Sequence, residues 1–539
     1  MALEYDGIVI GAGHNGLICT AYLAKAGLRV LLVERMVELG GGLDAHEDPR
    51  APGFWHNIHS VFHRGARGLP WFNDLRLADF GVEYVAPELG VSMLLPDGRS
   101  LRWYSDLDRT CASLAEFSRA DAATFREIHQ RFRPVVEQIV FPETYAPPVP
   151  FEEKRELLER SAAGREYLRY TTCSPEDFIL QHFESPQVQA FIAFLAVIRG
   201  FEIDAQGLGF LVPGMIAWGV NPQLCKGTSH HLADQLANVV VAAGGDVIEA
   251  NAVVRILVED GRATGVVLQD GTEVRARQFI ASNLNPQETF LNLVGREHLD
   301  PAFAQRVEGF RYSATTPIFA VNLALREPPR YTAAERCPDI HRTCMYIVGL
   351  DAYQDIRDLY AACRAGRLPP KLFMNGACLT VHDPSQAPPG QHCAFTWQLV
   401  PYDLADGGPA RWDTIREEFL ERQLARWREY APNLDERNII AKSCTTPLDI
   451  ERHDPNMHRG DWMVGELSAD QALDRRPLPE LAQYRTPIAG LYLCGSSCHP
   501  GGNITGAPGY NAAGVIARDL GLTPWWQPHD VRALWRALP

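Results

Sequence analysis

The segment from Tyr5 to Glu34 constrains the fold of this chain more than any other stretch. It opens with a short apolar run, Ile8–Ile10, followed by the glycine turn Gly11-Ala12-Gly13-His14-Asn15-Gly16 and then by a run rich in alanine and leucine. The apolar run predicts a buried parallel strand, and the run after the glycines predicts a helix. Together they predict a βαβ unit that binds a dinucleotide, the alternative being a purely structural turn.

The residues of this turn suit a pyrophosphate. Gly11 permits a sharp turn, Gly13 lets the backbone approach the phosphates, and Gly16 lets the helix pack closely on the strand. The N–H groups of the first helical turn, which includes Asn15, favour negative charge. A second apolar run, Val30–Val33, ends at Glu34, whose carboxylate can accept the hydroxyls of an adenosine ribose. An acid at this position selects against a ribose 2′-phosphate.

Two further glycine segments favour FAD over NAD. Arg35 and the turn Gly40-Gly41-Gly42 come after the ribose acid, where a second turn could pass along the pyrophosphate and ribityl chain. Near the C-terminus, an apolar strand ends at Gly495-Ser496, and the loop Asn503-Ile504-Thr505 precedes a small-residue helix. The N-terminus of that helix can face the flavin or its phosphates. We therefore predict bound FAD.

These motifs resemble those of the phytoene desaturase-like FAD-dependent oxidoreductases, a group that includes carotenoid desaturases, carotenoid isomerases and retinol saturases. The resemblance runs from end to end and is carried by GAGHNGL, ER with its GGG turn, Pro52-Gly53-Phe54, and GLYLCGSSCHPGGNITGAPGYNAA. The chain is most similar to the uncharacterised bacterial members. Gly42 stands where desaturases usually have arginine, and Asn57–Ser60 replaces an Asp-Ala-Gly-Pro-like run.

The resemblance implies an α/β fold, with a Rossmann-like FAD-binding domain of the glutathione reductase type and an interleaved α+β substrate domain. It also implies that the backbone at Val253 lies against the adenine. We assign residues 1–90, 215–300 and 455–524 to the FAD-binding domain, 91–214 and 301–454 to the substrate-binding domain, and 525–539 to a C-terminal tail. The aromatic tail could dock on a partner subunit, giving a homo-oligomer, or on a membrane surface, although packing on its own chain is the common outcome.

Composition excludes several function classes. The net charge is −15, and no basic stripe is present, so nucleic acid is not an expected partner. The 12 cysteines are scattered without a CxxC pair, which argues against a disulfide reductase or a cysteine metal site. Acidic residues at Glu4 and Asp6 stand where a signal peptide would need basic and apolar ones, so we expect a cytoplasmic protein.

The most apolar long region, Val188–Val220, contains Arg199, Glu202 and Asp204, so it does not have the pattern of a membrane span. We expect it to line a cavity for an apolar or amphipathic small molecule. A bound nicotinamide is not expected, because the chain carries a single dinucleotide fingerprint.

Three histidines are candidate catalytic bases, because imidazole titrates near neutral pH. His59 lies in an aromatic and imidazole-rich segment that the resemblance places beside the flavin, and His230 and His231 begin a predicted helix. The alternatives are that His59 satisfies backbone groups at a domain boundary and that the histidine pair is exposed to solvent. No third ligand at a suitable spacing accompanies the pair, so a metal site is not predicted.

The leading hypothesis is a flavoprotein dehydrogenase or oxidase. Hydride passes from a substrate C–H to flavin N5 while a base removes a proton, and dioxygen or a quinone reoxidises the cofactor. The alternatives are a redox-neutral double-bond isomerase and a flavin-bearing interaction protein without turnover. The sequence leaves the substrate, the electron acceptor and covalent attachment of FAD open.

Overall fold

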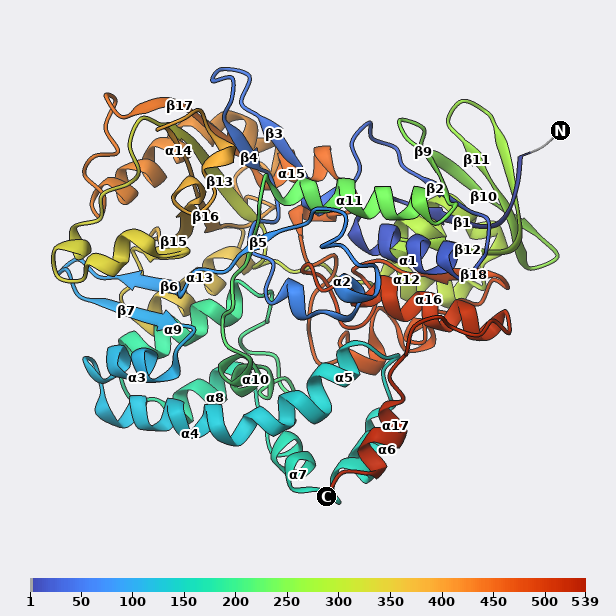
Figure 1. Cartoon of the computed structure of the whole chain (residues 1–539), viewed down its shortest axis with the longest axis horizontal. Coiled ribbons are helices and arrows are strands. Elements are labelled where there is room, and N and C mark those ends of the chain that lie inside the picture. The colour runs from blue at the N-terminus through green and yellow to red at the C-terminus, as the bar shows by residue number, and fades with distance from the viewer. Residues whose placement is uncertain (1–2) are drawn as a thin grey trace.

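The computed structural model describes residues 3–539 and consists of two lobes, each built on a seven-stranded sheet (Figure 1). The first sheet has the strand order β10-β11-β12-β1-β2-β9, with β18 also paired to β12. Its strands are β1 Leu3–Ile10, β2 Val30–Val33, β9 Asp246–Ile248, β10 Val253–Glu259, β11 Arg262–Leu268, β12 Glu273–Ser282 and β18 Leu491–Leu493. Strands from both ends of the chain thus share one sheet.

The centre of the first sheet is parallel, as the glycine fingerprint predicts. β1 pairs in parallel with β2 and β12, and β18 pairs in parallel with β12. The turn residues Glu259-Asp260-Gly261 and Asp270-Gly271 predict a β-meander, and it is present as the antiparallel strands β10, β11 and β12. The sequence also predicts separate strands at Glu273–Arg275 and Phe279–Asn283, but these form the single long strand β12, which runs from the meander into the parallel centre.

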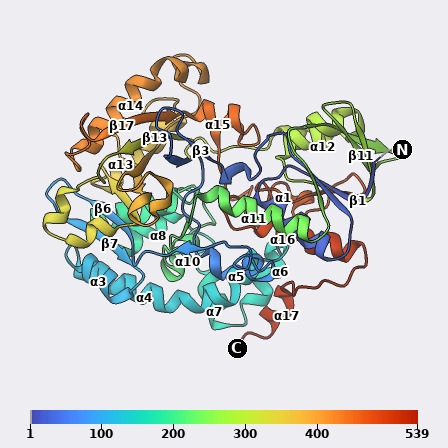
Figure 2. The same cartoon turned by 45° about the horizontal axis from the view of Figure 1, so that its top comes forward.

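Three helices cover the first sheet: α1 His14–Lys25, α11 Ser229–Ala242 and α16 Ala507–Asp519. α1 contacts both of the others, which Figures 1 and 2 show side by side. Two glycines permit close packing, one of α1 on the turn after β1 and the other of α16 on α1. A Cβ at Gly16 would lie 2.1 Å from the Gly11 carbonyl oxygen, and one at Gly509 would lie 2.1 Å from the Asn15 carbonyl oxygen. The role predicted for Gly16, close packing of helix on strand, fits this geometry.

The second sheet has the order β17-β13-β16-β15-β14-β6-β7. Its strands are β6 Leu89–Leu94, β7 Ser100–Tyr104, β13 Ile318–Leu325, β14 Met345–Val348, β15 Met374–Cys378, β16 His392–Leu399 and β17 Ile439–Thr445. The turn residues Pro96-Asp97-Gly98 predict a hairpin, which β6 and β7 form, and β13 pairs with β16 in antiparallel register. Apart from the start of β6, the strands of each sheet come from the segments assigned to the corresponding domain, and we keep that division as a proposal.

Helices form a layer below the second sheet in Figure 1. They are α3 Leu107–Ala115, α4 Arg119–Val135, α5 Phe141–Thr144, α6 Phe151–Leu158, α7 Ala162–Leu168, α8 Pro175–His182, α9 Pro186–Val197 and α10 Leu211–Trp218. The amphipathic pattern over Glu152–Arg169 predicts one helix, but it is interrupted, because Ser161 caps a new helix by accepting a hydrogen bond from Gly164 N (2.9 Å). Ser174-Pro175-Glu176-Asp177 predicts the start of a helix, and the capping box between Ser174 and Asp177 confirms it.

The apolar region Val188–Val220 packs in the core and does not form the cavity wall that the sequence predicts. Of its residues, all of which the structure describes, Ile198 alone lines the cavity. From Val188 to Val197 every side chain but Gln189 is buried, so α9 is apolar on all faces and lies inside the lobe against α8 and α13. Apolar side chains without a polar face indicate a central helix.

The remaining helices and strands pack around the two sheets and the helices described above. They are α2 Pro70–Asp74, α12 Pro301–Glu308, α13 Tyr353–Arg364, α14 Trp412–Arg428, α15 Pro447–His453, α17 Val531–Arg536, β3 Ala45–Glu47, β4 Trp55–Asn57, β5 Tyr84–Val85 and β8 Leu224–Cys225. β3 and α15 lie where the two lobes meet in both views (Figures 1 and 2).

The C-terminal tail packs on its own chain. The Trp525 ring stacks on Tyr22 with centroids 5.1 Å apart, and its Nε1 donates to the Tyr22 carbonyl (3.0 Å). α17 packs against α6 and buries Trp535. Among residues 3–539, the structure has no helix with the length and apolar character needed to span a bilayer.

Candidate active site

A cavity of about 720 Å³ lies between the two lobes and is lined by residues of both. The first lobe contributes the glycine turn after β1, the end of β2 and the start of β10. The second sheet contributes apolar and amide side chains, namely Ile318, Met345, Asn375, Trp397 and Leu399. The cavity therefore has two ends. The end formed by the glycine turns, where the sequence predicts a dinucleotide, is called the nucleotide end below, and the end formed by the second sheet is apolar.

The two predicted glycine turns lie against each other at the nucleotide end. Gly40 N donates to the Ala12 carbonyl (2.9 Å), and a Cβ at Gly41 would lie 3.3 Å from the Gly13 Cα. Asn283, at the end of β12, supports the first turn by donating from Nδ2 to the Gly11 carbonyl (3.1 Å). Sequence patterns did not identify Asn283, because it follows an ordinary buried strand without a motif of its own.

Glu34 closes the first turn. Its Oε2 accepts a hydrogen bond from Ala12 N (2.7 Å), and its Oε1 accepts one from Met36 N (3.0 Å). Carboxylate oxygens accept more than one hydrogen bond, so both can still receive a ribose hydroxyl. Arg35 and Val253 line the same end of the cavity.

The C-terminal loop completes the wall through Ser496, Asn503 and Ile504. Asn503 adopts a left-handed conformation (φ 66°), and its Nδ2 donates to the Arg199 carbonyl (3.2 Å). Behind the wall, the fully buried guanidinium of Arg476 donates to the Ser496 carbonyl (3.1 Å) and to further backbone carbonyls. The loop is thus held by hydrogen bonds from side chains to backbone carbonyls rather than by regular secondary structure.

Some of the predicted cofactor residues line the cavity, and the others lie behind the cavity wall and support it. Those that line the cavity are Gly11, Gly13, Asn15, Glu34, Arg35, Gly41, Gly42, Val253, Ser496, Asn503 and Ile504. Those that lie behind the wall are Ala12, Gly16, Gly40, Gly495 and Thr505. Thr505 illustrates the supporting role, because its carbonyl accepts hydrogen bonds from Trp71 Nε1 (2.6 Å) and Tyr145 (2.9 Å).

Of the three predicted catalytic histidines, His59 lines the cavity and the other two do not. His59 is 8% exposed, and its Nε2 has no hydrogen-bond partner among the residues that the structure describes. Burial lowers the pKa of His59 to about 4, so its imidazole is neutral at physiological pH. A neutral, unpartnered imidazole in the wall can hydrogen-bond a bound molecule.

His230 and His231 begin α11, outside the cavity wall. His230 faces Asp44 Oδ1 at 4.0 Å and Asp234 at 3.4 Å, and His231 Nε2 lies 3.3 Å from the Gly81 carbonyl. Neither imidazole faces the cavity, because the helix turns them toward neighbouring backbone and carboxylates. The proposal that either acts as the base loses its geometric support.

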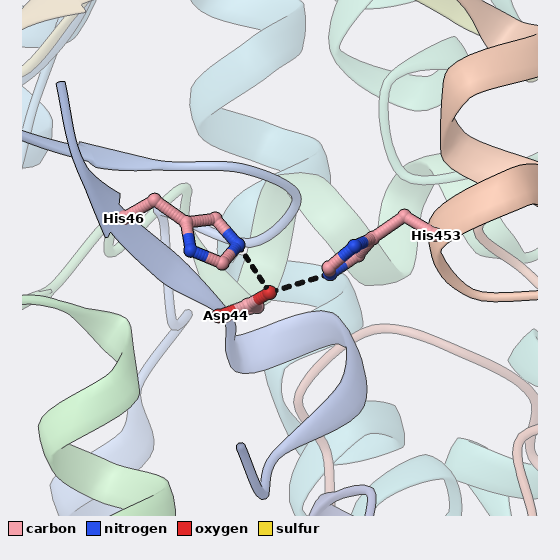
Figure 3. A group of neighbouring side chains, drawn as sticks. All are labelled: Asp44, His46 and His453. Carbon is pink, nitrogen blue, oxygen red and sulfur yellow. Dashed lines mark hydrogen bonds and ion pairs between the residues drawn. The ribbon is translucent and has the colours of Figure 1, made fainter. Parts of the chain in front are cut away.

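A hydrogen-bonded cluster that the sequence did not reveal lies on the cavity wall (Figure 3). Asp44 follows the second glycine turn, His46 lies on β3, and His453 ends α15. His453 Nε2 donates to Asp44 Oδ2 (2.6 Å), and His46 Nε2 makes an ion pair with the same oxygen at 2.8 Å. All three residues line the cavity. His453 and Asp44 are 409 residues apart, so no local spacing predicts the pair.

The three side chains of the cluster shift one another's pKa. Burial opposes ionisation of Asp44, but hydrogen bonds from His453 and His46 outweigh it and lower the pKa of the carboxyl group. The hydrogen bond to Asp44 raises the pKa of both imidazoles. Ligand atoms of the three side chains lie within 4.8 Å of one another, a spacing that could hold an ion. However, Asp44 Oδ2 is already engaged by both imidazoles, which favours a hydrogen-bonded cluster.

The opposite end of the cavity is apolar. Its side chains include Phe62, Ile198, Ile318, Met345, Trp397, Leu399, Ile450, Met457, Trp462 and Val464. Arg64 also lines the cavity and is partly buried; desolvation lowers its pKa to about 10, and its Nη1 donates to Asn503 Oδ1 (3.3 Å). The guanidinium therefore stays charged at neutral pH and fixes the side chain of a cavity residue.

Comparisons with known proteins agree with this arrangement. The family model described as flavin containing amine oxidoreductase matches residues 16–516. A limonene dehydrogenase subunit from Castellaniella defragrans is 31% identical over 98% of this chain and 98% of its own length. Prolycopene isomerase 1 of an Oncidium hybrid cultivar is 22% identical over 97% of this chain and 85% of its own.

A solved structure supports the fold. A triple mutant of putrescine oxidase superposes with a TM-score of 0.61 over 97% of this chain and 100% of its own, at 13% identity. The predicted α/β fold with a Rossmann-like FAD-binding domain is confirmed at this level.

The residues of the cavity also fit FAD. Two adjacent glycine turns expose backbone of the kind that phosphates need for close approach, and Glu34 lies beside the first turn, where the sequence predicts the ribose. The same cavity also includes His59 and the apolar wall. Fold, cavity and family match together establish that the chain belongs to the flavin-containing amine oxidoreductase family and is an FAD-dependent oxidoreductase, as its resemblance to the phytoene desaturase-like group predicted.

Proposed function

We propose that this protein is a dehydrogenase or oxidase that removes hydrogen from a hydrophobic or amphipathic small molecule. The observation that carries the proposal is the apolar wall that faces the same cavity as the nucleotide-binding turns. Binding pockets for apolar ligands combine such walls with a few oriented polar groups. The similarity to a limonene dehydrogenase over nearly the whole chain supports an apolar substrate.

Different residues of the chain have different roles in the proposed reaction. Bound FAD supplies a two-electron acceptor at its N5 atom. The glycine turns and the helix N-terminus of α1 hold the phosphates, and Glu34 holds the ribose. Side chains such as Trp397 and Leu399 bind the substrate and exclude water, and His59 hydrogen-bonds the flavin or the substrate. Exclusion of water protects reactive intermediates.

Dioxygen or a quinone is the proposed electron acceptor, because the sequence has one dinucleotide fingerprint, at Gly11–Gly16, and that site is taken by FAD. We also propose a cytoplasmic location. All 12 cysteines are free thiols, as expected of a protein in a reducing compartment.

The test is anaerobic mixing of the FAD-loaded protein with a panel of limonene, other cyclic and linear monoterpenes, cyclohexylamine and putrescine. We expect the flavin absorbance near 450 nm to bleach with a terpene-type compound and to persist with putrescine. Bleaching by the polar diamine alone would contradict an apolar substrate. Yellow colour that persists with every panel compound would refute the proposed activity.

A matched pair of variants tests the apolar wall itself. Ile318→Asp places a charge on a buried cavity residue, whereas Val381→Asp changes a residue that is 36% exposed and lies outside the cavity wall. We expect the first to lower kcat/KM for the bleaching compound by more than about tenfold, since a buried charge is costly. The second should leave it unchanged, and both should retain FAD.

A redox-neutral isomerase is the second candidate, favoured by the similarity to prolycopene isomerase 1 along 97% of the chain. Acceptor consumption separates the two functions. A dehydrogenase consumes one molecule of acceptor per product, whereas an isomerase converts substrate after a single initial reduction and consumes none.

A further inference from the structure

Oxidation of the proposed kind needs a base as well as a hydride acceptor. The substrate gives one hydrogen with its bonding electron pair to the flavin, and a second hydrogen leaves as a proton while its electron pair forms the new double bond. A base within the cavity must take that proton. The question of which side chain does so rests on the proposed function.

The ionisable groups of the cavity wall are not equivalent. Glu34 already accepts hydrogen bonds from Ala12 N and Met36 N at the nucleotide end. His59 lies in the wall but has no carboxylate hydrogen-bonded to it in the described structure, and burial lowers its pKa, so its protonated form is disfavoured. His453 lines the same cavity, with its Nε2–H donated to a buried carboxylate oxygen at 2.6 Å.

The Asp44–His453 pair has the geometry of a catalytic dyad. A carboxylate that accepts from one imidazole nitrogen fixes the tautomer, so that the lone pair is on the other nitrogen, here Nδ1. It also stabilises the imidazolium that forms when Nδ1 takes a proton. The Asp44 side chain is 6% exposed and therefore acts in a water-poor environment, whereas the His453 side chain is 32% exposed and can release a proton to water.

We propose that His453, oriented by Asp44, is the base that accepts the proton lost by the substrate during its oxidation. The proton bonds to Nδ1 of His453 as the substrate double bond forms, and the imidazolium later gives it to water. Asp44 is a positioning residue in this scheme, since it acts through His453.

Ionisable groups on several elements surround the dyad. His46 on β3 pairs with the same Asp44 oxygen, and its Nδ1 lies 3.6 Å from Glu38. His230 on α11 is 4.0 Å from the other Asp44 oxygen. The His59 ring is 5.8 Å from the His453 ring, and Asp454 follows His453 in sequence, its pKa raised to about 6 by burial. Among these groups, His46 lowers the pKa of His453 and Asp454 raises it.

The first experiment compares His453→Gln, Asp44→Asn and the control His298→Gln, an exposed histidine that does not line the cavity. All three are loaded with FAD and mixed anaerobically with the panel compound that bleaches the wild type, limonene being tried first. We expect His453→Gln to slow bleaching by about 10²–10⁴-fold, the usual contribution of a general base. Asp44→Asn should slow it less and displace the ascending limb of the pH–rate profile. His298→Gln should match the wild type.

A second experiment asks whether His453 is a base or only a structural residue. In His453→Ala, added imidazole should restore bleaching in proportion to its concentration, which a merely structural role would not allow. Independently of turnover, a ¹³C-histidine NMR titration should show the pKa of His453 falling when Asp44 is replaced by Asn, because the raising hydrogen bond is lost.

The outcomes discriminate between the two proposals. A wild type that no panel compound bleaches refutes the proposed function. A wild type that bleaches while His453→Gln bleaches as fast refutes the dyad alone. Stoichiometric metal in the purified protein that disappears in His453→Gln would assign the cluster to an ion and also overturn the dyad.

Discussion

Asn15 Nδ2 donates a hydrogen bond to Ser496 Oγ at 3.2 Å, although 481 residues separate them in the chain. The same Asn15 side chain accepts a hydrogen bond from Gly509 N through Oδ1 (3.4 Å). One amide therefore ties the N-terminal glycine turn to both the C-terminal loop and the start of α16. The nucleotide end of the cavity exists because these two chain ends are joined.

Two glycines of α16 test how closely this helix must approach α1. A Cβ at Gly509 would lie 2.1 Å from the Asn15 carbonyl oxygen, whereas one at Gly514 would meet no atom within 4 Å. We expect Gly509→Ala to lower the free energy of unfolding by about 1–3 kcal/mol, the usual cost of overpacking, and to weaken FAD binding. Gly514→Ala should raise it by about 0.5–1 kcal/mol, since alanine favours a helix. Chemical denaturation of both variants checks this pair, and equal effects would contradict it.

Glu34→Ala tests the ribose assignment. It removes the carboxylate that accepts from Ala12 N and Met36 N and that faces the proposed ribose position. We expect the Kd for FAD to rise by about 10–100-fold, equivalent to one or two charge-assisted hydrogen bonds. Fluorescence titration of the apoprotein with FAD measures it. Glu249→Ala is the control, an exposed acid just beyond the neighbouring strand β9; full flavin occupancy in Glu34→Ala would count against the assignment.

Arg476 tests the support behind the C-terminal loop. Its buried guanidinium donates to the carbonyls of Met463, Gly465 and Ser496, among others. Arg476→Met leaves these carbonyls without a donor, so we expect a loss of about 3–5 kcal/mol in the free energy of unfolding. Arg475→Met, at the exposed neighbouring position, should change it by less than about 0.5 kcal/mol. Thermal unfolding with FAD bound compares the two, and similar melting temperatures would disprove this role.

His63 predicts a pH dependence of stability. It is fully buried, and burial lowers its pKa to about 3 from the ordinary value of 6.5. Between those values the unfolded chain binds a proton at this histidine and the folded chain does not, so stability is present above pH 6.5 and lost as the pH falls. At pH 5 this difference amounts to about 2 kcal/mol.

The variant His63→Gln removes this proton uptake. We expect its unfolding free energy to fall less than that of the wild type between pH 7 and pH 5, by about the same 2 kcal/mol. Urea denaturation at the two pH values provides the comparison. Parallel losses in both proteins would show that the histidine is not buried as a neutral group.

Local sequence patterns predicted individual elements of both lobes. The strand at Val30–Val33 and the hairpin after Gly90 were predicted from apolar runs and turn residues, and both are confirmed. The glycine turns were recognisable for a similar reason, because each glycine is required by a backbone conformation or by a close approach of atoms within a few residues. The family resemblance supplied the remaining step, from a nucleotide-binding turn to FAD.

Features that depend on tertiary packing were not predictable in this way. The region Val188–Val220 is apolar, but composition does not distinguish a core helix from a cavity wall. His230 and His231 begin a helix as predicted, yet the face that each presents depends on how α11 lies against its neighbours. Asp44 and His453 meet because β3 and α15 come together between the lobes, and neither residue lies in a recognisable motif.

The order of β18 and α16 in the chain, long after β1, α1 and β12, has a consequence for biosynthesis. Because β18 and α16 are synthesised after the elements that they complete, a nascent chain that has already formed β1, α1 and β12 still lacks this strand and this helix. Flavin capture should therefore be a late event, and products of premature termination before residue 507 should emerge as flavin-free substrates for chaperones and proteases.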